Sequence, residues 1–219
     1  MNALITREFV TDTLVRSVLD VRGRALYELC FLHRHHFRNE IVADKLRMIL
    51  RYCADHGLQV NALSPELSAL RLGRAGADRW FAGLTTAEVI DPALVFEAHK
   101  RVMDVFDDLP AQQSRALASK YLHFHFPELF YLYDSRVETA ALALGRGECG
   151  YLAWPEHDPD YARFFACCRR LAEEFTSLAG RRPNPREMDR ILRGWMDHQE
   201  VAMLSARPQP ASVSQLGQS

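Results

Sequence analysis

The sequence lacks any long uncharged stretch of the kind that crosses a membrane. No segment approaches the ~20 consecutive apolar residues that span a bilayer. The opening MNALITREFV lacks the apolar core of a signal peptide. The five cysteines include no CxxC pair, which argues against a cysteine-rich zinc site and against a disulfide framework. We therefore predict a cytoplasmic protein that makes no membrane contact and whose cysteines are reduced core residues.

The net charge is close to zero, and the sequence contains few lysines. The 27 basic and 28 acidic residues give a net charge of −1, so the chain has no global attraction for phosphate. A nucleic-acid partner, with DNA the expected one, would need a local basic face. The region from Arg163 to Arg193 offers one, because eight arginines there outnumber four carboxylates. Only three basic residues are lysines, Lys45, Lys100 and Lys120, so a lysine in this chain is a candidate for a specific role.

Apolar residues recur at helical spacing along nearly the whole chain, and no alternating run bounded by turn residues indicates a strand. The pattern predicts a single all-α domain over residues 1–205, followed over 206–219 by a flexible tail with almost nothing to bury. Ser135 with Glu138 predicts a capping box at the start of one helix. Start and stop signals predict helical regions at about 6–36, 39–55, from 65, at 92–107, 112–126, 135–145, 159–179 and from 185.

The segment from Ser114 to Gly145 contains the densest set of reactive side chains. On a helix, Lys120 and His123 are neighbours on one face. The chain must then turn at Pro127, and an extended stretch leads to Asp134 at the start of the next helix. The helix rises only ~9 Å beyond Lys120, whereas the extended stretch can reach ~23 Å. We therefore expect Asp134 to return beside Lys120.

This segment resembles a family of DNA-repair enzymes. The sequence SKYLHF, followed by an apolar run into DSRV, is similar to the helix-hairpin-helix (HhH-GPD) DNA glycosylases, and most of all to their 8-oxoguanine glycosylase-like bacterial branch. The resemblance implies that Lys120 attacks the anomeric carbon of a damaged nucleoside as a Schiff-base nucleophile, and that Asp134 assists departure of the base. One feature differs from the family, because no glycine-rich hairpin follows Leu109 and Pro110.

Base excision also requires residues that hold the substrate. His123 would tune Lys120, and Arg136 would contact phosphate or cap the site. The substrate-binding residues predicted by this hypothesis are His123, Tyr133, Ser135 and Arg136. The aromatic candidates for the walls around a flipped base are Tyr131, Tyr133, Trp154 and Trp195.

The same pair of residues allows a non-catalytic interpretation. A lysine with a pKa of ~10.4 is protonated at neutral pH and cannot attack. Asp134 would stabilise the ammonium group, and the two could form an ion pair that pins two helices together. A catalytic pair should line an open pocket, whereas a structural pair should be covered by side chains. The alternative function is therefore a non-catalytic binding or regulatory protein on the same fold, for example in a bacterial defence system.

Two further patterns are weaker. His33, His35 and His36, with His123 and His125, suggest a metal site, but on a helix residues two apart point ~200° apart and cannot share one ion. We expect no metal and no cofactor. An arginine followed after four to six residues by histidine, as in HEPN ribonucleases, occurs twice, but an arginine-rich chain contains such matches by chance. A HEPN-like ribonuclease stays an outside alternative.

Overall fold

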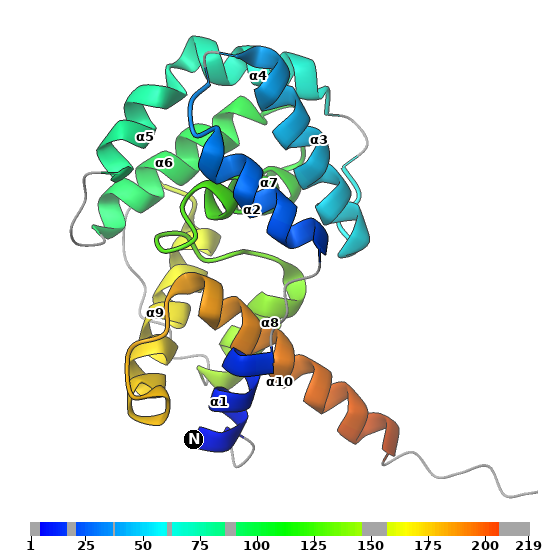
Figure 1. The fold of residues 1–219 in the computed structure, drawn as a ribbon, viewed down its shortest axis with the longest axis vertical. Helices are drawn as coiled ribbons and strands as arrows, with labels where there is room; N and C mark the ends of the chain where they lie inside the picture. Colours follow the sequence, from blue (N-terminus) through cyan, green and yellow to red (C-terminus); the bar gives the residue numbers. More distant parts are fainter. Residues whose placement is uncertain are drawn as a thin grey trace, which may run out of the picture.

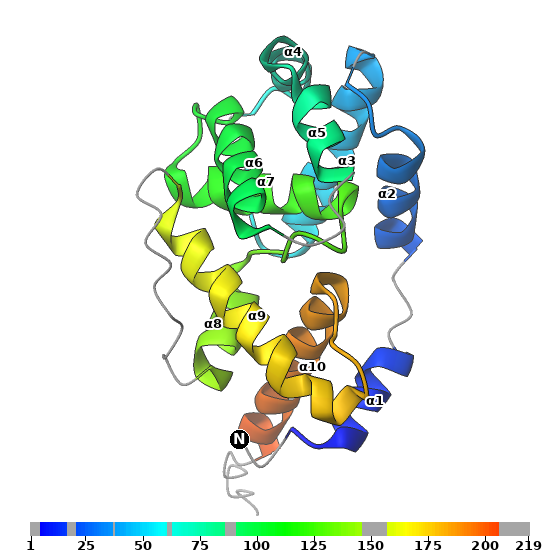
Figure 2. The ribbon, with the colours of Figure 1, turned by 90° about the vertical axis from the view of Figure 1, so that its left-hand side faces the viewer.

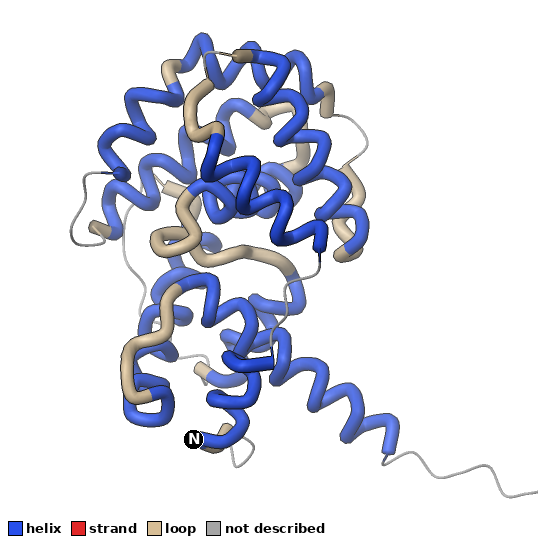
Figure 3. Tube along the Cα trace, in the orientation of Figure 1, coloured by secondary structure: helices blue, strands red, loops and turns tan. Residues whose placement is uncertain are grey.

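The computed structural model describes residues 5–16, 21–36, 38–60, 63–85, 91–145 and 157–205. These residues form α-helices and no strand, which confirms the all-α prediction (Figures 1 and 3). No described helix has both the length and the apolar composition needed to cross a membrane. The predicted tail over 206–219 lies outside the described residues. The helices are α1 (Arg7–Arg16), α2 (Val21–Leu32), α3 (Asn39–Asp55), α4 (Pro65–Ala75), α5 (Ala77–Thr85), α6 (Pro92–Val105), α7 (Ala111–His125), α8 (Ser135–Leu144), α9 (Pro159–Ala179) and α10 (Pro185–Ser205).

Local signals in the sequence set several of the helix ends. Gly180 follows α9 with φ 76°, a left-handed conformation that favours glycine. Asn184 caps α10, because its Oδ1 accepts the Glu187 N–H at 2.9 Å. The prediction of one helical region reaching the histidine cluster is wrong in its extent. Helix α2 ends at Leu32, and His36 lies in the connection to α3, where its backbone N–H donates to Asp78 at 2.7 Å.

The helices form two groups within the one domain (Figures 1 and 2). One group contains α2–α7, in which α3 packs on α4 and α6 packs on α7. The other contains α1 and α8–α10, so the first helix packs against α9 and α10 from the far end of the chain. Helix α7 is buried from Ser114 to His125 without interruption. Functional groups on α7 therefore lie in the interior of the protein.

The cysteines differ from the prediction at one position. Cys30, Cys53 and Cys168 are free and buried, as expected for core thiols. Cys167 is disulfide-bonded, so the prediction that it is reduced is wrong. The spacing of cysteines along a chain does not reveal which thiols the fold brings together. Cys149 lies outside the described residues.

Candidate functional site

Lys120 is completely enclosed by the protein, with an exposed fraction of 0%. Its Nζ donates a hydrogen bond of 2.9 Å to the carbonyl oxygen of Tyr133. Burial lowers the pKa of Lys120, and the negative charge of the nearby Asp134 opposes this shift only in part. The amine therefore joins α7 to the extended segment that precedes α8.

Asp134 caps α8 and pairs with a residue of α10. Its Oδ1 accepts the Val137 N–H at 2.9 Å, so the cap is Asp134 and not the predicted Ser135, which is the first residue of the helix. Its Oδ2 forms an ion pair with Arg193. Burial alone would raise the pKa of Asp134, but the charges of Arg193 and Lys120 outweigh burial and hold this pKa below its usual value. Among the described ion pairs, none joins Lys120 directly to Asp134.

Two more residues of α7 hold the extended segment. Ser119 Oγ accepts the Tyr133 N–H at 3.0 Å. His123 Nδ1–H donates to the Phe130 carbonyl at 2.6 Å, and His123 Nε2 accepts from the Tyr27 hydroxyl at 2.6 Å. Burial lowers the pKa of His123 to about 4. The imidazole is therefore neutral at pH 7 and does not supply the positive charge that would activate a neighbouring lysine.

The remaining predicted substrate-binding residues already have protein partners or lie on the surface. Tyr133 is buried, and Ser135 is exposed. Arg136 is bound to two carboxylates of α10, because its Nη2 donates to Asp197 at 3.0 Å and to Glu200 at 2.9 Å. The predicted phosphate contact of Arg136 would have to displace both carboxylates.

The aromatic walls proposed for a flipped base are part of the core. Tyr131 is buried, and its carbonyl oxygen accepts from the Tyr161 hydroxyl at 3.1 Å. Trp195 is also buried. Trp154 lies outside the described residues. All three described candidates, Tyr131, Tyr133 and Trp195, are therefore buried core residues.

Most of the arginine-rich region is neutralised by carboxylates. Five of its eight arginines form ion pairs: Arg163 with Glu138, Arg170 with Glu174, Arg181 with Glu187, Arg182 with Glu173 and Arg193 with Asp134. Arg186 and Arg190 differ, because each has a buried Nε for which the described structure provides no hydrogen-bond partner. The region is therefore not one continuous phosphate-binding face.

A groove of about 490 Å³ lies beside Arg186. It runs between α2, the segment that follows α7 and the start of α10. We call it the aromatic groove and define it by Tyr27, Phe31, Arg34, Phe126, Leu129 and Arg186. Sequence reasoning missed it because these residues are far apart in the chain. The only local signal is the apolar pair Phe31 and Leu32 directly before a polar cluster.

In the aromatic groove, two arginine guanidinium groups stack on aromatic rings. The Arg34 guanidinium lies over the rings of both Phe31 and Phe126, 4.8 and 5.7 Å from their centroids. The Arg186 guanidinium lies 4.2 Å from the centroid of Tyr27. The Nε atoms of Arg34 and Arg186 are buried, and no described residue accepts a hydrogen bond from either. The groove therefore combines aromatic surface with unused cationic donors.

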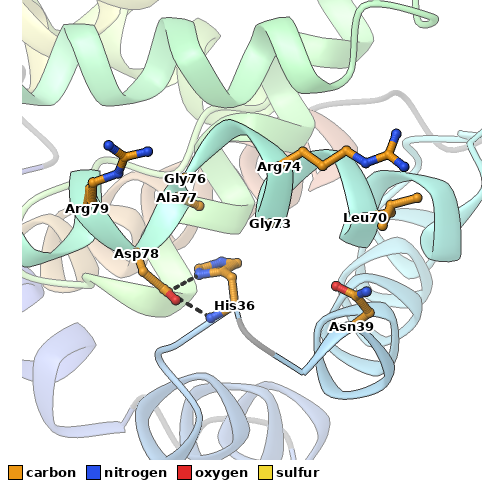
Figure 4. A pocket seen from close by; sticks show the side chains of 9 residues that line it. All are labelled: His36, Asn39, Leu70, Gly73, Arg74, Gly76, Ala77, Asp78 and Arg79. Carbon is orange, nitrogen blue, oxygen red and sulfur yellow. Dashed lines mark hydrogen bonds and ion pairs between the residues drawn. The ribbon is translucent and has the colours of Figure 1, made fainter.

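A second pocket, of about 420 Å³, lies where α4 meets α5 (Figure 4). The His36 ring lines this pocket and is hydrogen-bonded at both nitrogens. Its Nδ1–H donates to Asp78 at 2.9 Å, and its Nε2 accepts from the Tyr121 hydroxyl at 2.6 Å. Figure 4 shows Arg74 and Arg79 extending away from His36. The charged groups of this pocket therefore do not converge on one ligand position.

A third pocket, of about 570 Å³, lies around Trp80 between α4 and α6. Lys120 and Asp134 line none of these three pockets. Within the described residues, no group of three histidine, cysteine, aspartate or glutamate side chains is arranged to hold a metal ion.

Comparison with known proteins gives no family model, no curated protein and no solved structure that matches this chain. The resemblance to DNA glycosylases rests on the segment around Lys120 and Asp134 alone. The function must therefore be argued from the geometry of the site.

Proposed function

We propose that this chain is a non-catalytic helical binding protein in which Lys120 stabilises the fold. The observation behind the proposal is the complete burial of Lys120, whose Nζ is bonded to the Tyr133 carbonyl. A Schiff-base nucleophile must come within bonding distance of the anomeric carbon of its substrate. Lys120 has no exposed surface and lines none of the three pockets described above. This geometry favours the structural interpretation over glycosylase chemistry.

Lys120 is placed where it can hold two parts of the fold together. A buried amine costs free energy unless it is hydrogen-bonded, and the Tyr133 carbonyl accepts one of its N–H groups. The negative charge of Asp134 lies close enough to favour the ammonium form. Lys120 and Ser119 together bind both backbone polar groups of Tyr133. These contacts fix the segment that connects α7, in one group of helices, to α8 in the other.

The binding role is supported by the aromatic groove. It is open to solvent, its Phe31 ring is exposed, and the Nε atoms of Arg34 and Arg186 have no acceptor among the described residues. Buried donors without partners are rare in folded proteins, and a ligand is one way to satisfy them. An open, mostly apolar groove with a few polar groups is the usual form of a binding site.

Borohydride trapping tests the absence of catalysis. Wild-type protein is incubated with abasic-site and 8-oxoguanine oligonucleotides, and borohydride would reduce any Schiff base to a stable adduct. We expect no adduct that depends on Lys120, so Lys120→Ala should react as wild type does, and so should Lys100→Ala, which removes a partly exposed lysine that pairs with Asp104. Lys120→Ala should lower the free energy of unfolding by roughly 2–5 kcal/mol, because it leaves a cavity and removes the amine that donates to the Tyr133 carbonyl. Lys100→Ala should change it by less than about 0.5 kcal/mol.

Lys120→Met provides a variant of similar volume that keeps the core filled. An adduct that forms with wild type and Lys100→Ala but not with folded Lys120→Met would overturn the proposal. It would establish Lys120 as a nucleophile and base excision as the function.

A further inference from the structure

We infer that the aromatic groove binds single-stranded nucleic acid, with an unpaired base stacked on Phe31 and the adjacent phosphate held by Arg34 and Arg186. This inference rests on the proposed function, because it names the ligand of a non-catalytic binding protein. The groove is lined by none of the predicted catalytic or substrate-binding residues, although Arg186 belongs to the arginine-rich region identified in the sequence.

The base would extend a stack that already exists. Phe31 is 65% exposed although it is a large apolar side chain, and the Arg34 guanidinium lies over its ring. The order Phe31, Arg34, Phe126 alternates ring and cation. A nucleobase is flat and has a π-face, so it can stack on the outer ring whatever its sequence identity. Single strands expose such faces, whereas a duplex keeps its bases stacked on one another.

The phosphate would contact guanidinium groups that no described carboxylate neutralises. Arg34 and Arg186 are both partly exposed, and neither forms an ion pair with a described residue. Arg190 lies one turn after Arg186, and burial together with the charge of Arg186 lowers the pKa of Arg190. The carboxylates of Glu187 and Asp189 oppose this shift only in part. The planar guanidinium matches the oxygens of a phosphate, so an anion bound here would remove this imbalance.

The charged residues that line the groove also restrict which ligand can bind there. Glu28 and Glu128 line the groove, so it is not a broad basic surface for the two phosphate rows of a duplex. An apolar peptide would cover Phe31 but offer no anion to the guanidinium groups of Arg34 and Arg186. A single strand supplies both a base that can stack on Phe31 and a phosphate that can bind the two arginines.

Fluorescence polarisation with a labelled oligothymidylate tests the stacking contact. Phe31→Ala should weaken binding by roughly five- to hundredfold, the usual effect of removing one base-stacking side chain. Leu32→Ala is the matched control, because Leu32 is the next residue, is 73% exposed and does not line the groove. It should change the Kd by less than about threefold. A hairpin duplex labelled in the same way should bind more weakly than the single strand.

The salt dependence of binding tests the phosphate contact. Arg186→Gln should reduce the slope of log Kd against log salt by about 0.7, the value for one phosphate of a single strand. Arg163→Gln is the control, because Arg163 pairs with Glu138 outside the groove, and it should leave the slope unchanged. Glu128→Gln should tighten binding, because it removes a negative charge from the groove lining.

Three outcomes would overturn the inference. In the first, Phe31→Ala and Arg186→Gln bind the oligonucleotide as wild type does, or the wild-type protein does not bind it at all. In the second, the duplex binds as tightly as the single strand. In the third, a labelled peptide of alternating glutamate and phenylalanine binds in a Phe31-dependent manner while the oligonucleotide does not, which would make the groove a protein-docking site. The non-catalytic function would survive each of these, since it fails only on an adduct at Lys120.

Discussion

His123 is a buried imidazole with both ring nitrogens engaged. Its Nδ1–H donates to the Phe130 carbonyl, and its Nε2 accepts from the Tyr27 hydroxyl. This pattern fixes one tautomer and leaves neither nitrogen free for a metal or for proton transfer. A side chain that suggests chemistry in the sequence therefore acts here as a connection between α2, α7 and the segment before α8.

Removing the Tyr27 hydroxyl should show how much its hydrogen bond to His123 contributes to the free energy of unfolding. Tyr27→Phe leaves His123 Nε2 buried without a donor, so it should lower the free energy of unfolding by about 1–3 kcal/mol. Tyr52→Phe is the matched control. Both tyrosine rings pack edge-on against Phe124, at 4.8 and 5.0 Å, but the Tyr52 hydroxyl makes no hydrogen bond with any described residue. Urea unfolding of both variants measures the difference, and equal losses would contradict the proposed role of the hydroxyl.

At the scale of the element, the start of α8 is held by two separable contacts of Asp134. One is the cap to the Val137 N–H, and the other is the ion pair with Arg193 of α10. Asp91 offers a comparison, because it caps α6 by accepting the Ala93 N–H at 2.9 Å from an exposed position. The two aspartates therefore share a capping role but differ in the ion pair and in burial.

Substitutions at these caps should separate the two contacts. Asp91→Ala should cost about 1 kcal/mol of unfolding free energy, the usual value of a cap. Asp134→Ala should cost roughly 3–5 kcal/mol, because it also leaves Arg193 without one of its carboxylates in a largely buried site. Asp134→Asn keeps an acceptor for the cap and should lie between them. Thermal or urea unfolding checks the order, and equal costs for Asp91→Ala and Asp134→Ala would show that the ion pair contributes nothing.

Helix ends were predictable wherever the signal lies within a few residues. Ser64 with Pro65, and Gly180 after α9, mark helix boundaries as expected because a cap or a left-handed glycine needs only its own turn. Helix α5 was missed, since a single left-handed residue, Gly76, divides a continuous helical pattern. Asp134 was placed correctly at a helix start, but its partner Arg193 comes from 59 residues further along the chain.

At the scale of the whole molecule, the burial of Lys120 and the existence of the groove both depend on packing between distant segments. Chain reach could predict that Asp134 returns towards Lys120, because only a few residues connect them. Chain reach could not predict that Lys120 is fully buried, because that burial depends on helices from other parts of the chain that pack on α7. The aromatic groove requires α2, α7 and α10 to meet, and no local pattern encodes that meeting.

Three buried histidines, all in the group formed by α2–α7, give the stability of the protein a pH dependence. Burial lowers the pKa of His36 to about 4, of His99 to about 3 and of His123 to about 4. In the unfolded chain a histidine has a pKa near ~6.5. Below that pH the unfolded chain binds protons that the folded chain does not bind, so these residues destabilise the fold as the pH falls.

We therefore expect the free energy of unfolding to be largest above pH 6.5 and to fall as the pH drops from about 6.5 towards 4, by up to about 1.4 kcal/mol per pH unit for each buried histidine. Urea unfolding at pH 7, 6 and 5 measures this slope. His99→Gln should make it shallower, whereas His35→Gln, at a 72% exposed side chain, should leave it unchanged. Carboxylates with lowered pKa values such as Asp134 lose their contribution only as the pH falls below about 4, so they do not explain a slope between pH 7 and 5. A stability that stays constant over that range would mean that the histidines are not held neutral by burial.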